Sequence, residues 1–362
     1  MDKTKKQFDV ITIGGATRDI MFYSGDGRLI TTNNITWQKF LAFEYGAKIT
    51  ADKLYFSFGG GAANTAVTFS KLGLKTAVIC RLGNDDNGRE ILKNFKNQGI
   101  DTSFIKINKK ETTGFSVILA VRGESHEHVV FGYRGANNSL NGADLPLSLP
   151  PPLSVLGGAK SCASSDLTAF AFASRLRSLP PVASRPPRAG GEIIETNWFY
   201  VSSLPKDTWE EIMKKLIATG KNIIWNPGGY QLKQPSKLKN YLPKIKLFIL
   251  NHDEALEFKK LKDIRGLLRY IKGLGPQIAV ITDGAKGAYV YDGKKYYYMK
   301  AMASKSVDTV GVGDAFSAAF TGALIYGKNI KTALAWGIKN SASVVSKIGA
   351  QNGILNKRQI VK

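Results

Sequence analysis

Short apolar segments alternate with amphipathic segments along most of this chain, and this alternation constrains the fold more than any other feature. The apolar segments are continuous and β-branched, which is typical of strands buried on both faces of a parallel sheet. They lie at residues 8–15, 76–83, 198–204, 222–225, 247–251 and 278–282. Helical spacing of apolar residues follows or separates them, at residues 61–72, 88–98, 206–218 and 264–272. The order predicts an α/β fold with a mostly parallel sheet covered by helices on both faces.

Two stretches depart from this alternation. Residues near 20–57 and residues 113–134 alternate polar and apolar side chains, as exposed antiparallel strands do. We expect them to form a small sheet appended to the main one.

Residues 145–190 differ in composition from the rest of the chain. Eight of the 13 prolines lie in these 46 residues, with one lysine and no isoleucine, asparagine, glutamate or tyrosine. The residues that it favours have GC-rich codons, which is typical of inserted or out-of-frame coding sequence. Proline at this density disfavours helix interiors and central strands. We expect an irregular insertion without a catalytic role; a proline-rich linker that binds a partner is the alternative.

Basic residues are in large excess. The 362 residues include 51 lysines and arginines against 28 acidic residues, which gives a net charge of +23. Such a field attracts phosphate groups, whether on nucleotides, nucleic acids or anionic lipids. The cations form no run of five or more, so the chain has no dedicated nucleic-acid tail, and we do not expect a nucleic-acid partner.

Cysteine content and hydropathy bear on the compartment. Two cysteines, Cys80 and Cys162, cannot form a disulfide framework, and Cys80 lies in an apolar run like a small buried hydrophobe. No run of 18 apolar residues predicts a membrane-spanning helix. The polar start leads directly into a strand without a signal-like apolar region. We therefore expect a cytoplasmic protein that does not enter a membrane.

The segment DTVGVGDAFS, from Asp308 to Ser317, carries the clearest chemical signal. A glycine-rich turn that leads into a helix presents unpaired backbone N–H groups and the positive end of the helix dipole, which together bind phosphate. Asp314 lies in the first turn of that helix, where it could accept a proton from a substrate hydroxyl or could be an ordinary helix-start aspartate. Phe316 replaces the third glycine of a dinucleotide fingerprint, and no GxxxxGK[ST] occurs in the chain.

A second glycine cluster, FGGGAAN, ends at Asn64. Its three glycines allow a close backbone approach to a ligand, and the asparagine can donate to and accept from a hydroxyl. By itself this segment is more typical of a tight turn and a well-packed helix than of a ligand site.

Together the two segments resemble the signatures of the PfkB, or ribokinase-like, carbohydrate kinase family. The first resembles the N-terminal signature, from Gly59 to Gly83, and DTVGVGDAF resembles the C-terminal one, usually DTxGAGDxF. Supporting matches are NDDNG, YRGAN, NHDE, TDGAKGA and the late GAQ. The resemblance covers the chain except residues 145–190. It implies a single kinase domain over residues 1–362, a ribokinase-like three-layer α/β sandwich whose β-sheet lid is formed by residues 20–57 and 113–134.

The resemblance also implies which residues perform the chemistry. Asp314 would be the base that removes the proton from the hydroxyl to be phosphorylated. The backbone N–H groups of Gly311, Val312 and Gly313 would hold the transferred γ-phosphoryl. Val312 replaces the usual small residue of this turn; because valine keeps the N–H donor, we expect activity to be retained.

Substrate contacts follow by the same resemblance. Asp19 matches the family's aspartate for sugar hydroxyls, and Gly59, Gly60 and Asn64 would contact the same substrate. Arg134, on the returning lid strand, could reach a phosphate or the substrate, or could be a surface cation.

On the nucleotide side, Asn251 and Glu254 match the N-x-x-E motif that holds hydrated Mg²⁺ near the phosphates of ATP. Asp283 and Gly284 belong to a loop near the nucleotide, and Asn340 lies where the family lines the adenine pocket.

Asp308 and Thr309 lie where some family members bind a monovalent cation such as K⁺.

Two other groups carry simpler interpretations. His126 and His128 lack partners for a zinc site, and we expect them to face solvent on the lid. The tyrosines at 296–298 are typical of a half-buried edge strand and not of a base-stacking platform.

The sequence thus predicts an ATP- and Mg²⁺-dependent kinase of a sugar or sugar-like alcohol, of the ribokinase or fructokinase type. A nucleoside kinase on the same fold remains an alternative, as does a catalytically idle relative that binds nucleic acid or a protein. The family frequently pairs its lids, so a homodimer through the lid is also expected.

Overall fold

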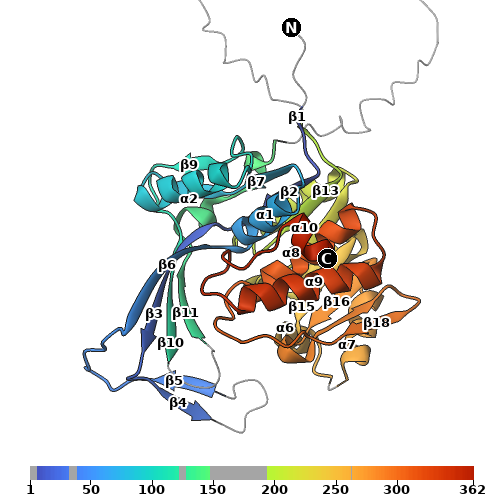
Figure 1. Cartoon of the computed structure of the whole chain (residues 1–362). Helices are drawn as coiled ribbons and strands as arrows, with labels where there is room; N and C mark the ends of the chain where they lie inside the picture. The colour runs from blue at the N-terminus through green and yellow to red at the C-terminus, as the bar shows by residue number, and fades with distance from the viewer. Residues whose placement is uncertain (1–5, 32–38, 122–127, 147–193, 262) are drawn as a thin grey trace, which may run out of the picture.

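The computed structural model describes residues 6–31, 39–121, 128–146, 194–261 and 263–362 (Figure 1). Most of the proline-rich segment, residues 147–190, lies outside these ranges. Leu145, its expected first residue, is only 6% exposed and belongs to the core. Among the described residues, no helix is both long and apolar enough to cross a bilayer.

An eight-stranded sheet forms the centre of the molecule, in the order β18-β17-β16-β15-β14-β13-β2-β7. Its strands are β2 (Val10–Ile13), β7 (Thr76–Ile79), β13 (Trp198–Val201), β14 (Asn222–Trp225), β15 (Leu247–Asn251), β16 (Ile278–Thr282), β17 (Ala288–Tyr291) and β18 (Tyr296–Met299). The six strands from β16 to β7 in this order are parallel, and β17 and β18 are added antiparallel at one edge. The predicted parallel sheet is therefore confirmed. The tyrosine segment is the expected half-buried edge strand.

Helices cover both faces of this sheet because successive strand residues point to opposite sides. Ile11 and Ile13 pack in one cluster with α3 to α7, whereas Val10 packs with α1, α8, α9 and α10. The first group comprises α3 (Trp209–Ala218), α4 (Gly229–Leu232), α5 (Pro235–Leu238), α6 (His252–Phe258) and α7 (Ile264–Gly273). The second comprises α1 (Gly61–Lys71), α8 (Val312–Ile325), α9 (Ile330–Val345) and α10 (Lys357–Val361). Helix α2 (Asp86–Asn97) packs beside α1.

A separate four-stranded sheet extends from the body at one side (Figure 1). Its order is β11-β10-β3-β6, with β3 (Thr17–Ser24), β6 (Lys53–Gly59), β10 (Phe115–Val121) and β11 (His128–Tyr133). These strands confirm the small sheet, which we call the lid. One pairing differs from the expected antiparallel pattern: β3 and β10 are parallel. Both strands lead away from the body, while β6 and β11 return to it, so the two outgoing strands meet at the centre.

Short pairs complete the fold. They are β1 (Lys6–Gln7) with β12 (Ile194–Glu195), β4 (Arg28–Thr31) with β5 (Lys39–Ala42), and β8 (Arg81–Gly83) with β9 (Lys106–Asn108). Within the described residues, 3₁₀ turns lie at Gly135–Ser139, Gly142–Asp144, Leu242–Lys244 and Gly284–Lys286.

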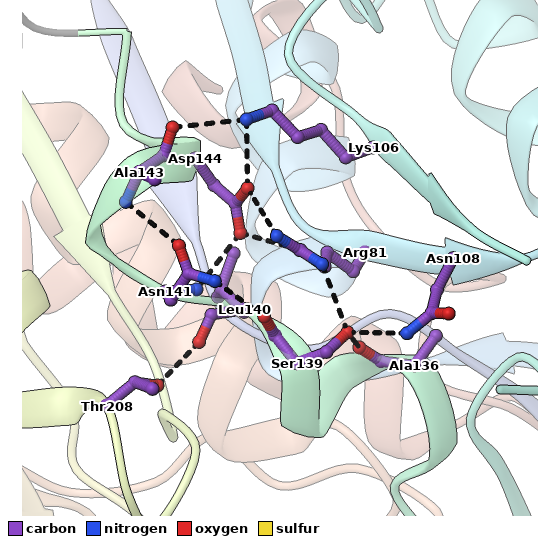
Figure 2. A network of polar contacts seen from close by, with 10 residues as sticks. All are labelled: Arg81, Lys106, Asn108, Ala136, Ser139, Leu140, Asn141, Ala143, Asp144 and Thr208. Atoms are coloured by element: carbon purple, nitrogen blue, oxygen red, sulfur yellow. Dashed lines mark hydrogen bonds and ion pairs between the residues drawn. The ribbon is translucent and has the colours of Figure 1, made fainter. Parts of the chain in front are cut away.

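A polar network holds the last described turn before residue 147 (Figure 2). Arg81 donates two hydrogen bonds to the Asp144 carboxylate, at 2.7 and 2.9 Å, and Lys106 Nζ lies 3.1 Å from the same group. Asp144 also caps its own turn by accepting the Asn141 N–H. Although burial alone would raise the pKa of Asp144, these bonds hold it below its usual value. The network therefore ties this turn to β8 and β9.

Candidate active site

The carboxyl ends of the parallel strands gather the chemistry-bearing residues at one edge of the sheet. Within the sheet, strand β2 lies between β7, which is the next strand of this sheet along the chain, and β13, which comes much later. Open α/β sheets bind ligands at such a reversal of strand order. Here Gly14 follows β2 and Ser202 follows β13, and the Ser202 N–H donates to Ile13 O at 3.0 Å. A Cβ on Gly14 would lie 2.1 Å from Ser202 Oγ, so the two segments are in close contact.

The two glycine-rich motifs meet above this point. Asn64 of α1 donates through Nδ2 to Asp314 Oδ2 at 2.8 Å, across 250 residues of sequence. Gly61, which begins α1, also lies close: a Cβ there would be 3.6 Å from Asp314 Oδ1. The predicted base and the predicted substrate residue therefore belong to one site.

Asp19 reaches the same site from lid strand β3. It is 3% exposed, and Thr17 Oγ1 donates to it at 2.9 Å. Gly59 lies directly beside it, because a Cβ at Gly59 would stand 1.9 Å from Asp19 Oδ2. Gly60 has φ +90° and packs against Gly15 O. These two glycines are thus required by the close approach of β6 to β3 and to the end of β2.

Burial makes both carboxyls weaker acids. It raises the pKa of Asp314; the Asn64 hydrogen bond lowers this pKa, and the charge of Asp19 raises it further. Burial likewise raises the pKa of Asp19, against hydrogen bonds from Thr17 and Ser116. A buried carboxylate with a raised pKa is a better proton acceptor than an exposed one. The pair suits the binding and deprotonation of a hydroxyl.

The start of α8, beside Asp314, has backbone geometry that suits an anion. Gly311, the residue before the helix, is left-handed with φ +72°, and a Cβ there would meet Ala350 Cβ at 2.3 Å. Gly313 faces open space. The first N–H groups of this 14-residue helix have no partner within the helix and carry the positive end of its dipole. They can accordingly hold a phosphoryl group next to the carboxylate.

The sequence profile of the pfkB family carbohydrate kinases matches residues 30–160 and 190–357. The chain belongs to the PfkB family. The matched ranges leave out residues 161–189, which lie within the proline-rich segment.

Named relatives agree with this membership. A ribokinase of Haemophilus influenzae is 24% identical over 88% of this chain and 90% of its own length. A nucleoside kinase of Methanothermobacter thermautotrophicus is 25% identical over 84% of this chain and 83% of its own. The structure of Arabidopsis thaliana ribokinase with ribose and ATP superposes with a TM-score of 0.70, at 18% identity and 98% coverage of both chains. The fold is therefore ribokinase-like, and the protein is a kinase that acts on an alcohol group.

The N-x-x-E residues form a reciprocal cap at the start of α6. Asn251 Oδ1 accepts the Glu254 N–H, and Glu254 Oε2 accepts the Asn251 N–H, both at 2.8 Å. Burial raises the pKa of Glu254 to about 7, with added repulsion from Glu257 and Asp314. A carboxyl in this state is stabilised by a nearby cation, and hydrated Mg²⁺ needs only oxygen acceptors for its waters. The residues present therefore fit Mg²⁺.

Asp283 and Gly284 follow β16 at the next strand end. Asp283 Oδ1 lies 3.3 Å from His252 Nδ1, and its Oδ2 lies 3.3 Å from Lys286 Nζ. Gly284 has φ +49°, which starts the turn. His252, which the sequence did not single out, thus links α6 to this loop.

Two predicted site residues have their polar groups engaged by the protein. Arg134 donates to Leu204 O at 3.0 Å and to Ser203 Oγ, so it binds the loop after β13. Asn340 is fully buried and bridges two backbone groups, of Ala315 and Leu355, at 2.9 Å each. This geometry favours a structural role for both side chains and does not support an adenine contact by the Asn340 amide.

The expected cation residues sit beneath the lid. Asp308 is 3% exposed and accepts the N–H groups of Val310 and Gly349, at 3.0 and 2.7 Å. Thr309 Oγ1 lies 3.1 Å from His128 Nδ1 on β11. The expectation that His128 faces solvent is wrong, because its ring is only partly exposed and contacts this loop from β11. His126 lies outside the described residues.

Proposed function

We propose that this protein transfers the γ-phosphoryl group of ATP to a hydroxyl of a sugar or sugar-like substrate, as ribokinases and fructokinases do. The observation that carries the proposal is the position of Asp314. It lies at the N-terminus of α8, bonded to Asn64 and within electrostatic range of Asp19. A proton acceptor, a phosphate site and a hydroxyl site are therefore adjacent.

The reaction is one displacement at phosphorus. Asp314 takes the proton as the substrate oxygen bonds to the γ-phosphorus, while the bond to the β–γ bridging oxygen breaks and ADP leaves. The N–H groups of Gly311, Val312 and Gly313 hold the phosphoryl oxygens, so positioning and electrostatics supply the catalysis. Valine at 312 keeps its N–H, and we expect it to be compatible with this role.

Asp19, Gly59, Gly60 and Asn64 bind the substrate hydroxyls in this proposal. The lid that carries Asp19 covers the site and excludes water, which protects the phosphoryl group from hydrolysis. We do not assign Arg134 to the substrate, because it is bound to the β13 loop.

In this proposal, ATP would bind between the start of α8 and the ends of β15 and β16. Asn251 and Glu254 would hold hydrated Mg²⁺, which supplies charge neutralisation at the phosphates. Asp283 and Gly284 would border the nucleotide. A monovalent cation near Asp308 and Thr309 remains a prediction, tested by comparing activity in K⁺ and in a large organic cation.

A nucleoside substrate is the second candidate, supported by the similarity to the Methanothermobacter nucleoside kinase. Release of ADP in the presence of ribose, fructose, 2-keto-3-deoxygluconate or adenosine separates the two. A catalytically idle binding protein would release no ADP with any of them.

The Asp314→Asn variant tests the base. Replacing the carboxylate by an amide removes the proton acceptor but preserves size, so ADP release should fall at least about hundredfold with an unchanged melting temperature. Asp86→Asn, which alters an exposed carboxylate on α2, is the matched control and should keep full activity. Equal rates for wild type and Asp314→Asn would contradict the mechanism.

We also propose a homodimer through the outer face of the lid. The register of the four strands puts apolar side chains from every strand on the face opposite Asp19. Exposed members are Leu54, Phe56, Val129, Phe131 and Tyr133. Contiguous apolar surface of this kind marks an interface, and a second copy of the same flat sheet is complementary to it.

A further inference from the structure

A chain of three side-chain amides leads to the proposed base. Asn94 of α2 donates through Nδ2 to Gln351 Oε1 at 3.0 Å. Gln351 in turn donates through Nε2 to Asn64 Oδ1, also at 3.0 Å. Asn64 then donates to Asp314 Oδ2 at 2.8 Å. Helix α2, the loop after α9 and helix α1 are thus linked in series to one carboxylate.

The polarity of this chain is set at both ends, by the Asn94 donor and by the Asp314 carboxylate, which when ionised can only accept. An amide has one accepting and one donating end, so a donor at Asn94 turns the Gln351 oxygen toward α2 and its NH₂ toward α1. The Asn64 oxygen then faces Gln351, and its NH₂ faces Asp314. Reversing Asn64 would place its oxygen against the carboxylate and leave two donors facing each other at Gln351.

The loop that carries Gln351 is itself anchored. Lys71 Nζ reaches the backbone oxygens of Gln351 and Ile354, at 3.4 and 3.5 Å. Gly349 N–H bonds to Asp308, and Ala350 packs against Gly311 at the start of α8. The Gln351 side chain therefore starts from a fixed backbone.

We propose that Gln351, supported by Asn94, is a positioning residue that holds the Asn64 amide with its NH₂ toward Asp314. This inference rests on the proposed function of Asp314. The locked NH₂ stabilises the ionised carboxylate more strongly than the protonated acid, because hydrogen bonds to a charged acceptor are stronger. A free Asn64 could reverse and accept a hydrogen bond from protonated Asp314, which would stabilise the wrong state for a base.

Other ionisable groups also act on Asp314. Asp19 from β3 and Glu254 from α6 repel its charge, and Tyr200 of β13 lies within electrostatic range. The Asn64 bond opposes the raised pKa that burial and Asp19 produce in Asp314. Loss of the lock should therefore shift the acid limb of activity upward.

The experiment compares pH profiles of kcat/KM for wild type and Gln351→Leu. Leucine cannot donate to Asn64, so we expect the acid limb to move up by about half to one pH unit. At a pH below the limb, kcat/KM should therefore fall about three- to tenfold relative to wild type. The rate on the alkaline plateau should change little. Asn94→Leu frees the Gln351 amide and should move the acid limb in the same direction by a smaller amount than Gln351→Leu. It replaces Gln351→Leu in the test if that variant does not fold.

Gln234→Leu is the matched control. It removes a glutamine between α4 and α5 that donates to the Tyr230 carbonyl of α4, and its profile should equal that of wild type. An unmoved acid limb in Gln351→Leu, or an equal loss of rate at every pH, would overturn the inference. That outcome is distinct from failure of the proposed function, which would be seen as full activity in Asp314→Asn.

Discussion

At the scale of single residues, the site is built by close approach. Gly59 has no side chain because the Asp19 carboxylate occupies the position of its Cβ. Asp314 accepts a hydrogen bond from the Asn64 amide. Sequence spacing identified these residues as candidates. It could not show that the polar groups of Arg134 and Asn340 bond to other parts of the protein, because those partners lie far away in the chain.

Gly59→Ala should displace Asp19, since the new methyl group would lie 1.9 Å from Asp19 Oδ2. We expect kcat/KM for the hydroxyl substrate to fall about tenfold or more, equivalent to ~1.4 kcal/mol of transition-state binding. Steady-state kinetics and a melting curve measure it. Gly229→Ala, where a Cβ meets open space, should change neither. Wild-type kinetics in Gly59→Ala would show that Asp19 does not bind the substrate.

At the scale of elements, strands and helices followed the sequence closely, and β14, β15 and β16 have the predicted bounds. Their apolar runs are short, β-branched and buried on both faces, so local pattern and tertiary burial agree. The lid was also predictable in extent. The parallel pairing of β3 with β10 was not, because strand direction depends on where the chain goes between them.

The turn that Asp144 caps should depend on its carboxylate. Asp144→Asn leaves Arg81 partly buried without its anionic partner, and we expect a loss of about 3 kcal/mol in unfolding free energy at pH 7. The pKa of Asp144 is lowered in the folded state. Its contribution is therefore complete above the unfolded pKa, near 3.8, and is lost as the pH falls through the lower folded pKa.

Urea unfolding at pH 7 and at lower pH measures this difference between wild type and Asp144→Asn. The control is Asp86→Asn, whose partner Arg89 and whose own side chain are exposed; it should cost at most about 0.5 kcal/mol. Equal stability of wild type and Asp144→Asn at pH 7 would show that the network of Figure 2 does not stabilise the fold.

At the scale of the whole molecule, we propose that the body and the lid form one kinase domain, whose sequence is interrupted by the proline-rich segment. The lid face opposite the site is apolar and exposed. In a monomer this apolar face would remain in contact with water. Phe131→Asp should therefore convert a dimer to monomers, because it introduces a charge into the proposed interface.

Light scattering with size-exclusion chromatography measures the mass of each variant. Val361→Asp, which changes an apolar residue that is 63% exposed on α10, should leave the dimer intact. A wild-type protein that is monomeric at all concentrations would exclude the dimer.

The sequence by itself determined the layered α/β fold, the lid segments, the family, and the two motifs that supply Asp314 and Asn64. These follow from local periodicity and from spacing within short segments, which the chain carries without reference to its fold. The tertiary structure alone decided that Asn64 contacts Asp314, that His128 reaches Thr309, and that Gln351 lies behind the site. Such contacts join residues 181 to 287 positions apart, and their geometry depends on how every intervening element packs.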